Sequence, residues 1–172
     1  MKKDNSEEIF PVVDEEGRVL RSATRGECHS GSRLLHPVVH LHVFDAEGRL
    51  YLQRRPDWKD IQPGKWDTAV GGHMDYGEDV LEALRREARE ELGLTGFTPR
   101  FLTRYVFDSV RERELVNAYM AIVDPSEVAP SAEELDGGAW WTPAQLADAM
   151  GKDILTPNFE QEYTRLFIDR EA

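Results

Sequence analysis

Cysteine and long apolar runs are both scarce in this sequence of 172 residues. The single cysteine, Cys28, excludes an internal disulfide and suits a reducing compartment. No apolar run approaches the roughly 20 residues that a membrane helix needs. The start of the sequence, from Met1 to Phe10, is polar and lacks the apolar core of a signal peptide. We therefore expect a cytoplasmic protein with no membrane partner.

Basic residues are also in short supply. Lysine and arginine total 21 against 33 aspartates and glutamates, and the formal net charge is −12. Long nucleic acids bind to basic surfaces that release counterions, so this charge argues against them as partners. It does not argue against a small phosphorylated substrate that arrives with metal ions. The oligomeric state stays open, with a homodimer as one candidate because dimers are the commonest soluble assembly.

The remaining composition is that of an ordinary globular protein. Hydrophobic residues make up 40% and charged residues 31% of the chain, a balance that supports a folded core. The length suits one domain, and we find no internal repeat or long linker. We therefore expect residues 1–172 to form a single domain, with residues 1–30 as an N-terminal hairpin extension.

Short β-rich segments and a few helix signals indicate the fold class. Turn residues at 14–17 predict a hairpin over 9–23. Threonine–proline pairs at 142–143 and 156–157 combine an N-cap with a first-turn proline, and so predict two helices, the second from Asn158 to about Asp169. Strands mixed with a few helices predict an α/β (α+β) fold with the sheet between helices. Further strands are expected at 38–44, 50–55, 66–70, 101–107, 115–123 and up to Trp141.

The segment 72–94 is the most informative part of the chain and reads GHMDYGEDVLEALRREAREELGL. Its spacing predicts a helix from Val80 to Leu92. Asp79 is the expected N-cap, and Glu82 completes a capping box. Gly93 fits the left-handed position that ends helices. The expected apolar stripe consists of Leu81, Leu84, Ala88 and Leu92.

Three carboxylates of this helix are predicted to share one face. Glu87, Glu90 and Glu91 stand at i, i+3 and i+4. They would repel one another in water, and a hard divalent cation would offset that repulsion. Carboxylate oxygens suit Mg²⁺, with Mn²⁺ as an alternative. Gly72 would let the backbone bend so that its carbonyl also reaches the metal, and Glu78 is a further candidate ligand.

The order of these residues, G-x(5)-E-x(7)-R-E-U-x-E-E-x-G-U, resembles the Nudix box. Seven fixed positions would match by chance on the order of once in 10⁸ starting points. The resemblance implies the Nudix fold, a mixed β-sheet between α-helices, and pairing of Arg86 with a box carboxylate. It also implies Mg²⁺-dependent hydrolysis of the pyrophosphate bond in a nucleoside di- or triphosphate or a nucleoside diphosphate derivative.

The catalytic roles are expected to fall on Glu87, Glu90 and Glu91. A metal-activated water would attack one phosphorus in line, with a phosphate as the leaving group. The spacing does not identify the base. Glu87 and Glu90 are the first candidates, and Glu133 or Glu134 on a later acidic loop are others.

The sequence before the box is similar to a second group, the isopentenyl-diphosphate isomerase branch of the Nudix superfamily. The similarity runs from the segment HPVVHL at 36–41 through QRR at 53–55 and PGKW at 63–66. By this resemblance Arg55 and Lys59 would hold a substrate diphosphate. A second metal cluster would comprise His29, His36, His73 and Glu112. Glu112 and Glu114 could serve either this cluster or the box. We expect Glu114, two residues further along the same strand, to be an accessory metal ligand with the box carboxylates or a base.

One position departs from the isomerase pattern. The isomerases carry a catalytic cysteine two residues before the third histidine, and here that position is Gly71. The box is also complete, whereas it is commonly degenerate in isomerases. Both facts favour hydrolysis. An isomerase-like enzyme and a non-catalytic nucleotide-sensing module are the alternatives, although sensing modules often lose the box glutamates that this chain retains. His40 and His42 simply alternate along a strand, so we expect them to have structural roles.

Overall fold

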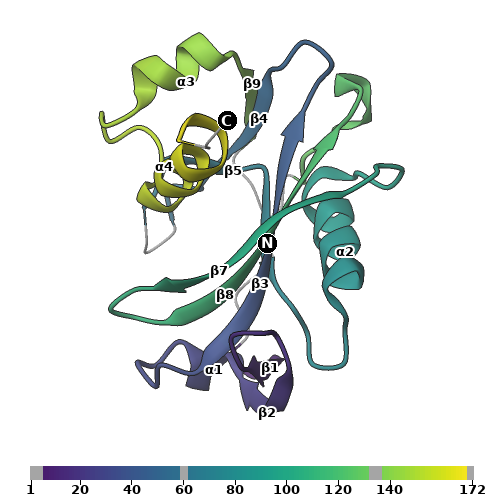
Figure 1. Ribbon diagram of the computed structural model, residues 1–172. Coiled ribbons are helices and arrows are strands. Elements are labelled where there is room, and N and C mark those ends of the chain that lie inside the picture. The colour runs from purple at the N-terminus through teal and green to yellow at the C-terminus, as the bar shows by residue number, and fades with distance from the viewer. Residues whose placement is uncertain (1–5, 59–61, 132–136, 170–172) are drawn as a thin grey trace.

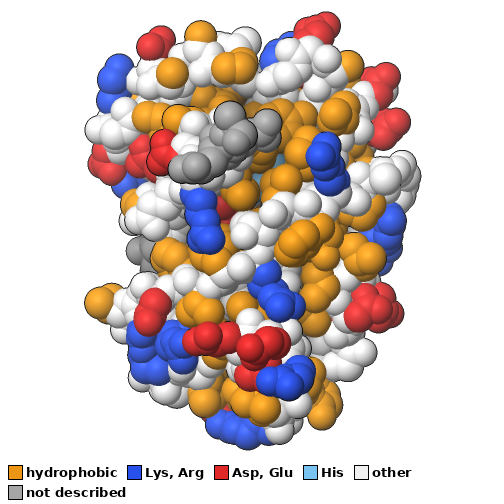
Figure 2. All heavy atoms as spheres, in the orientation of Figure 1, with side chains coloured by type: hydrophobic (Ala, Val, Ile, Leu, Met, Phe, Trp, Pro, Cys, Tyr) orange, Lys and Arg blue, Asp and Glu red, His pale blue; other side chains and the backbone are white. Residues whose placement is uncertain are grey.

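The computed structural model describes residues 6–58, 62–131 and 137–169. Within these ranges the main element is a seven-stranded sheet, with helix α2 on one face and helices α3 and α4 on the other (Figure 1). The two sets of helices sandwich the sheet, as expected from the sequence. None of the helices in the described ranges is long and apolar enough to cross a bilayer. Figure 2 shows acidic and basic side chains interspersed on one face of the molecule.

The sheet is mixed. Strands run in the order β5-β4-β3-β8-β7, and β6 pairs with β3 while β9 pairs with β4. The central pair, β3 and β8, is parallel, and the other pairs are antiparallel. The strands are β3 (Leu35–Phe44), β4 (Leu50–Arg54), β5 (Trp66–Thr68), β6 (Val70–His73), β7 (Arg100–Asp108), β8 (Arg113–Ile122) and β9 (Gly138–Trp141).

Helix α2 (Val80–Leu92) forms where the sequence predicts it. The Asp79 side chain accepts a hydrogen bond from the backbone N–H of Glu82, and the Glu82 side chain accepts one from that of Asp79. Gly93 ends the helix with a φ of 62°, which favours glycine because it has no Cβ. The local signals in this segment therefore suffice to set both ends of the helix.

The buried face of α2 differs from the predicted stripe at one position. Leu84 and Ala88 are fully buried against β3, but Leu81 is 45% exposed. The face instead turns to include Ala83 and the carboxylate residue Glu91. The prediction for Leu81 is wrong because spacing alone does not say how a helix is rotated over its sheet.

Helices α3 (Pro143–Ala149) and α4 (Pro157–Tyr163) cover the opposite face. Leu146 and Phe159 pack there against Leu50 and Leu52 of β4. Both helices begin at the predicted threonine caps. The chain continues from α4 into a π-helical turn, η2 (Thr164–Ile168), so the predicted final helix is not regular throughout.

The predicted strand at 66–70 is in fact two strands. β5 pairs with β4, and after a break at Ala69 the chain continues as β6, which pairs with β3. The prediction merged them because the local pattern contains no break. The division follows from the change of partner, and it brings the two glycines of β6 next to the central strand.

The N-terminal hairpin is confirmed as a separate two-stranded sheet. It consists of β1 (Ile9–Val13) and β2 (Val19–Thr24), followed by the short helix α1 (Arg25–Cys28), which the sequence did not predict. A short 3-10 turn, η1 (Pro125–Glu127), follows β8. Phe10 of β1 is fully buried and stacks on His73 of β6, with ring centroids 4.7 Å apart. The hairpin therefore closes one end of the main sheet.

Candidate functional site

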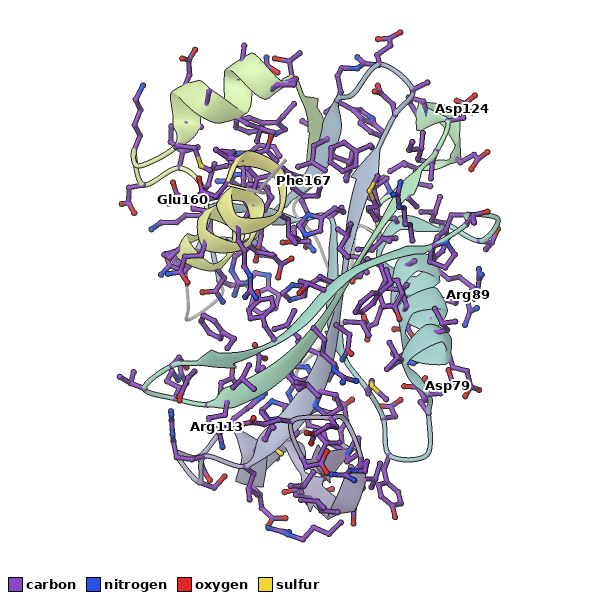
Figure 3. All side chains as sticks on the ribbon, in the orientation of Figure 1. Asp79, Arg89, Arg113, Asp124, Glu160 and Phe167 are labelled. Carbon is purple, nitrogen blue, oxygen red and sulfur yellow. The ribbon has the colours of Figure 1, made fainter. Side chains whose placement is uncertain are left out.

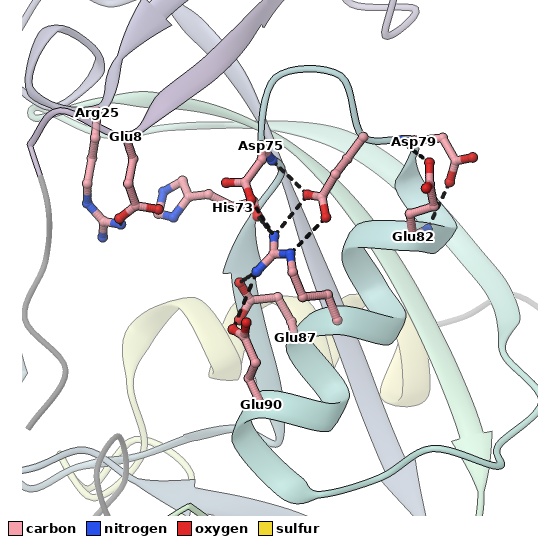
Figure 4. Close-up of polar contacts among 10 residues, drawn as sticks. Glu8, Arg25, His73, Asp75, Asp79, Glu82, Glu87 and Glu90 are labelled. Atoms are coloured by element: carbon pink, nitrogen blue, oxygen red, sulfur yellow. Dashed lines mark hydrogen bonds and ion pairs between the residues drawn. The ribbon is translucent and has the colours of Figure 1, made fainter.

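Arg86 of α2 joins three parts of the predicted box. Its Nε lies 2.7 Å from Glu78 Oε2, and its Nη1 lies 2.8 Å from Glu87 Oε1 and 3.4 Å from Glu90 Oε2. Its Nη2 donates to the carbonyl of His73 at 3.0 Å. Figure 4 shows these dashed lines converging on the guanidinium. The predicted pairing of Arg86 with box carboxylates is therefore present in the structure, and it ties the loop, the helix and β6 together.

The charges of Arg86, Glu78 and Asp75 shift one another's pKa values. The hydrogen bond with Glu78 raises the pKa of Arg86. Burial works to raise the pKa of Glu78, but hydrogen bonds from Arg86 and from the backbone of Asp75 hold it below its usual value. Burial raises the pKa of Asp75, whose Oδ2 lies 3.6 Å from Arg86. Carboxylates thus outnumber the guanidinium in this set, as expected where a cation binds.

Gly72 has a steric role in addition to the predicted one, that its carbonyl reaches the metal. A Cβ at this position would lie 2.2 Å from Cδ of Glu87, far inside contact distance. The φ of Gly72 is not in the left-handed region, so backbone bending does not require glycine here. A side chain at this position would instead push the Glu87 carboxylate away from the strand, against which it now lies directly.

The three box glutamates share one side of the helix but differ in exposure. Glu91 is 6% exposed, and its carboxylate accepts hydrogen bonds from the backbone N–H of Gly71 at 3.2 Å and from Nε2 of Gln53 at 3.3 Å. The Glu87 side chain is 12% exposed and that of Glu90 is 35% exposed. The set therefore runs from a fixed carboxylate at the sheet to a more accessible one at the rim.

On the other side of β6 a second polar cluster contains His29, His36, His73 and Glu112. One ligand atom from each residue lies within 4.8 Å of the others. The Nε2 atoms of the three histidines are buried and without a hydrogen-bond partner among the described residues. Glu112 Oε2 is 2.8 Å from His29 Nε2, but the contact does not have hydrogen-bond geometry. The structure thus brings together the four residues that the sequence suggested as a second metal cluster.

A contact with the backbone fixes the orientation of the His36 imidazole. His36 Nδ1 lies 3.0 Å from the carbonyl oxygen of Leu34, so Nδ1 carries the proton and Nε2 faces the cluster. Burial lowers the pKa of His36 and holds that of His73 well below its usual value. Neutral imidazoles offer a lone pair, which is the form that binds metals.

Glu114 lies on the histidine side of the sheet. Its Oε2 is 3.7 Å from His73 Nε2, and its side chain is 14% exposed. Burial, with repulsion from Glu112, raises its pKa to about 7. The structure therefore places Glu114 beside the histidine cluster, and not among the box carboxylates with which it was grouped as a metal ligand.

Arg55 follows β4 and lies beside Asp67 of β5, with Nη1 to Oδ2 at 3.6 Å. Its neighbour Arg54 contacts Asp57, so the two arginines have different partners. The second predicted diphosphate contact, Lys59, lies outside the described residues, as do the alternative bases Glu133 and Glu134.

A third polar group, which sequence reasoning missed, lies between the sheet and α4. Glu162 of α4 is 2% exposed and accepts hydrogen bonds from His40 Nδ1 (2.9 Å), His42 Nε2 (2.5 Å) and the Tyr105 hydroxyl. Phe167, labelled in Figure 3, packs its ring edge-on against that of His42, with centroids 5.3 Å apart. The alternation of two histidines on one strand face was the available signal, but their carboxylate partner is more than a hundred residues away.

The comparisons with known proteins agree with this geometry. The model of the NUDIX domain family matches residues 34–161. The chain belongs to the Nudix family. A protein of Streptomyces coelicolor named as an uncharacterized Nudix hydrolase is 32% identical over 163 residues, covering 94% of this chain and 90% of that protein. An isopentenyl-diphosphate Delta-isomerase of Clavibacter sepedonicus is 34% identical, covering 83% of this chain and 78% of that protein.

Solved structures confirm the Nudix fold. A crystal structure of a Deinococcus radiodurans protein superposes with a TM-score of 0.78 at 26% identity, covering 93% of this chain and 99% of that one. The MutT protein of Methanosarcina mazei gives a TM-score of 0.64 at 23% identity, covering 77% and 92%. The predicted family and its isomerase-like relatives are therefore both confirmed. As a Nudix enzyme with a complete box, the chain is a hydrolase acting on pyrophosphate bonds.

Proposed function

We propose that this Nudix hydrolase cleaves the pyrophosphate bond of a nucleoside diphosphate derivative or a nucleoside di- or triphosphate, with Mg²⁺ as cofactor and Mn²⁺ as a substitute. The observation that supports it best is the Arg86 network, in which one guanidinium orients Glu78, Glu87 and Glu90. Preorganised charged groups are effective because they do not have to reorganise when the reaction occurs.

The donor set at the box fits a hard cation. The side chains supply carboxylate oxygens only, and the missing Cβ of Gly72 lets the Glu87 carboxylate approach the backbone. Oxygen ligands are those that Mg²⁺ and Mn²⁺ prefer. When bound, the metal would neutralise pyrophosphate charge and lower the pKa of a water molecule. Glu87, Glu90 and Glu91 are the residues that we expect to hold it.

Three further roles fall on residues of the protein: a structural contact, proton acceptance and phosphate binding. Glu91, fixed by Gly71 and Gln53, is suited to a permanent structural contact in the site. Glu90, at the accessible rim, is suited to accept the proton of the attacking water, with Glu87 as the other candidate. Arg55 would bind a phosphate of the substrate, since guanidinium groups match phosphate geometry.

The test is a phosphate-release screen with Mg²⁺ against nucleoside triphosphates, nucleoside diphosphates, nucleotide sugars and dinucleoside polyphosphates. We expect hydrolysis of one class and a loss of about 100-fold or more in Glu90→Gln. Glu47→Gln is the matched control, because Glu47 lies in an exposed turn and the same charge is removed. Turnover near wild type in Glu90→Gln would contradict the site, provided that circular dichroism shows both variants folded.

The histidine cluster supports a second candidate function. The three buried Nε2 atoms and Glu112 form a donor set suited to a borderline or transition metal. The second candidate function is an isomerase activity, which would convert isopentenyl diphosphate to its dimethylallyl isomer. Incubation of the wild-type protein and of Gly71→Cys with isopentenyl diphosphate tests it. Formation of the dimethylallyl isomer by the wild type would favour this function. Formation by the Gly71→Cys variant alone would show that the wild type lacks isomerase activity because residue 71 is glycine.

A further inference from the structure

The Glu162 carboxylate sets the orientation of His40. Both its oxygens lie near His40 Nδ1, at 2.9 and 3.1 Å, and it also accepts from His42 and Tyr105. Donors from β3 and β7 therefore meet at one carboxylate of α4. Because Nδ1 is held by a carboxylate, it carries a proton, and the Nε2 atom of His40 must face away from Glu162.

The Nε2 atom of His40 faces the glycine step of β6. His40 pairs with Gly71 across the β3–β6 ladder, and a Cβ on Gly71 would lie 3.6 Å from Cδ2 and 3.9 Å from Nε2 of His40. The His40 side chain is 20% exposed, and Gly71 beside it is exposed. Glycine at position 71 thus leaves space directly in front of an oriented imidazole.

The surroundings favour a cationic imidazole at neutral pH. Burial works to lower the pKa of His40, but the Glu162 carboxylate outweighs it and raises the pKa to about 9. Glu114 and Asp67 add to the increase. Asp67 also lies 3.6 Å from Arg55, so its carboxylate acts electrostatically on His40 and contacts the predicted diphosphate-binding arginine.

We propose that His40 is a substrate-binding residue, in which Nε2–H donates a hydrogen bond to a phosphate oxygen of the substrate in the space over Gly71. Glu162 is its positioning residue. This rests on the proposed function only in requiring a substrate that carries a diphosphate. It adds a cationic donor on the face of β6 opposite the box, so that the anion is held from both sides of the Gly71–Gly72 step.

The alternative is that the group only anchors α4 to the sheet. Both roles require Glu162, so a loss of stability in its variants does not separate them. Direct observation of the His40 ring does, since an anchor has no reason to respond to an anion. The charged and polar groups around the ring are Glu162 of α4, His42 of β3 and Tyr105 of β7, which share the Glu162 carboxylate, with Glu114 of β8 and Asp67 of β5 acting on it electrostatically.

The first experiment follows the imidazole nitrogens of the full chain by ¹⁵N NMR while inorganic pyrophosphate is added without metal. The His40 signals are assigned by their loss in His40→Gln. We expect pyrophosphate to shift them, and we expect calorimetry to show about tenfold weaker binding in His40→Gln. Arg18→Gln is the control, because it removes one positive charge from an exposed turn.

A pH series then tests the positioning role. Wild-type affinity for pyrophosphate should fall as the pH rises through about 9, where His40 loses its proton. In Glu162→Gln the fall should occur at least about one pH unit lower, because the carboxylate that raises this pKa is gone.

Three results would overturn the proposal: no pyrophosphate binding by the wild type, unshifted His40 signals at saturation, or equal affinity in wild type and His40→Gln. Failure of the hydrolase proposal would look different. Pyrophosphate would still bind and shift His40, but no nucleotide would be cleaved with Mg²⁺.

Discussion

The two faces of β6 carry polar sites of opposite character. Toward α2, carboxylate oxygens crowd around Arg86, and the outermost side chain, Glu90, is 35% exposed. Toward the hairpin and β8, the donors are mostly imidazole nitrogens, and His36 is fully buried. Only a strand backbone that includes Gly71 and Gly72 separates them. One strand can therefore carry two chemically different sites, because successive residues face opposite sides of a sheet.

The largest effect on hydrolysis should come from two variants of β6, each of which adds one methyl group to a different face of the strand. In Gly72→Ala the Cβ would displace the Glu87 carboxylate, and we expect hydrolysis to fall about 100-fold or more. In Gly71→Ala the Cβ would be in ordinary contact with His40, and the loss should be far smaller. Initial rates of phosphate release and thermal midpoints of both variants make the comparison. Equal losses would show that the box face is not where hydrolysis depends on close approach.

The next largest difference between the two faces should be in stabilisation by an added metal ion. Zn²⁺ or Mn²⁺ at about a hundredfold excess over its Kd should raise the free energy of unfolding by about 2.7 kcal/mol if the histidine cluster binds it. We expect His36→Gln to abolish this increase and Glu90→Gln to retain it. Differential scanning calorimetry after chelator dialysis provides the measurement. Retention in His36→Gln would place the ion elsewhere.

A pH series should isolate the effect of the Glu162–His40 pair on stability from the effects of both candidate metal sites. The folded-state pKa of His40 is raised to about 9, so its contribution is complete below its unfolded value of about 6.5 and is lost as pH rises through 9. The pKa of Glu162 is lowered mainly by His40 against the effect of burial, so its contribution is lost at acid pH. We expect the difference in free energy of unfolding between wild type and Glu162→Gln to shrink by about 3 kcal/mol between pH 6.5 and 9.

Urea unfolding of both proteins across this range makes the measurement. Other titrating groups, such as Glu114, contribute in both proteins and largely cancel in the difference. A difference that stays constant from neutral to alkaline pH would contradict the pairing of His40 with Glu162.

The smallest effects should come from the helix caps on the two sides of the sheet. Asp79→Ala should cost about 1 kcal/mol of stability, since only the start of α2 loses a cap. Thr156→Ala should cost more, because Thr156 is 3% exposed and its hydroxyl also donates to Asp67 at 3.0 Å. Chemical denaturation of both variants ranks them. A greater cost in Asp79→Ala would reverse this part of the comparison.

The box helix was predictable because its determinants are local. The ends of α2 depend on Asp79, Glu82 and Gly93, which lie within a turn of the groups they contact. The break at Ala69 was not predictable, because it reflects a change of pairing partner from β4 to β3. Leu81 was misplaced for a similar reason, since the sheet decides how the helix is rotated.

The candidate sites show the same division. The spacing of Glu87, Glu90 and Glu91 was enough to place them on one side of a helix. It did not reveal that Glu91 is fixed by Gly71, nor that Gly72 is needed for the close approach of Glu87. The resemblance to isomerases grouped the cluster histidines, whereas residue patterns alone assigned His40 and His42 to packing.

The family, the box helix and the carboxylates on that helix follow from the amino-acid sequence alone, because they depend on residues within a few turns of one another. The side of β6 that each polar group occupies, and the contact of Glu162 with His40, depend on how distant segments pack. Those contacts join residues up to 122 positions apart. No local pattern encodes them, because the packing of α4 on the sheet brings the partners together.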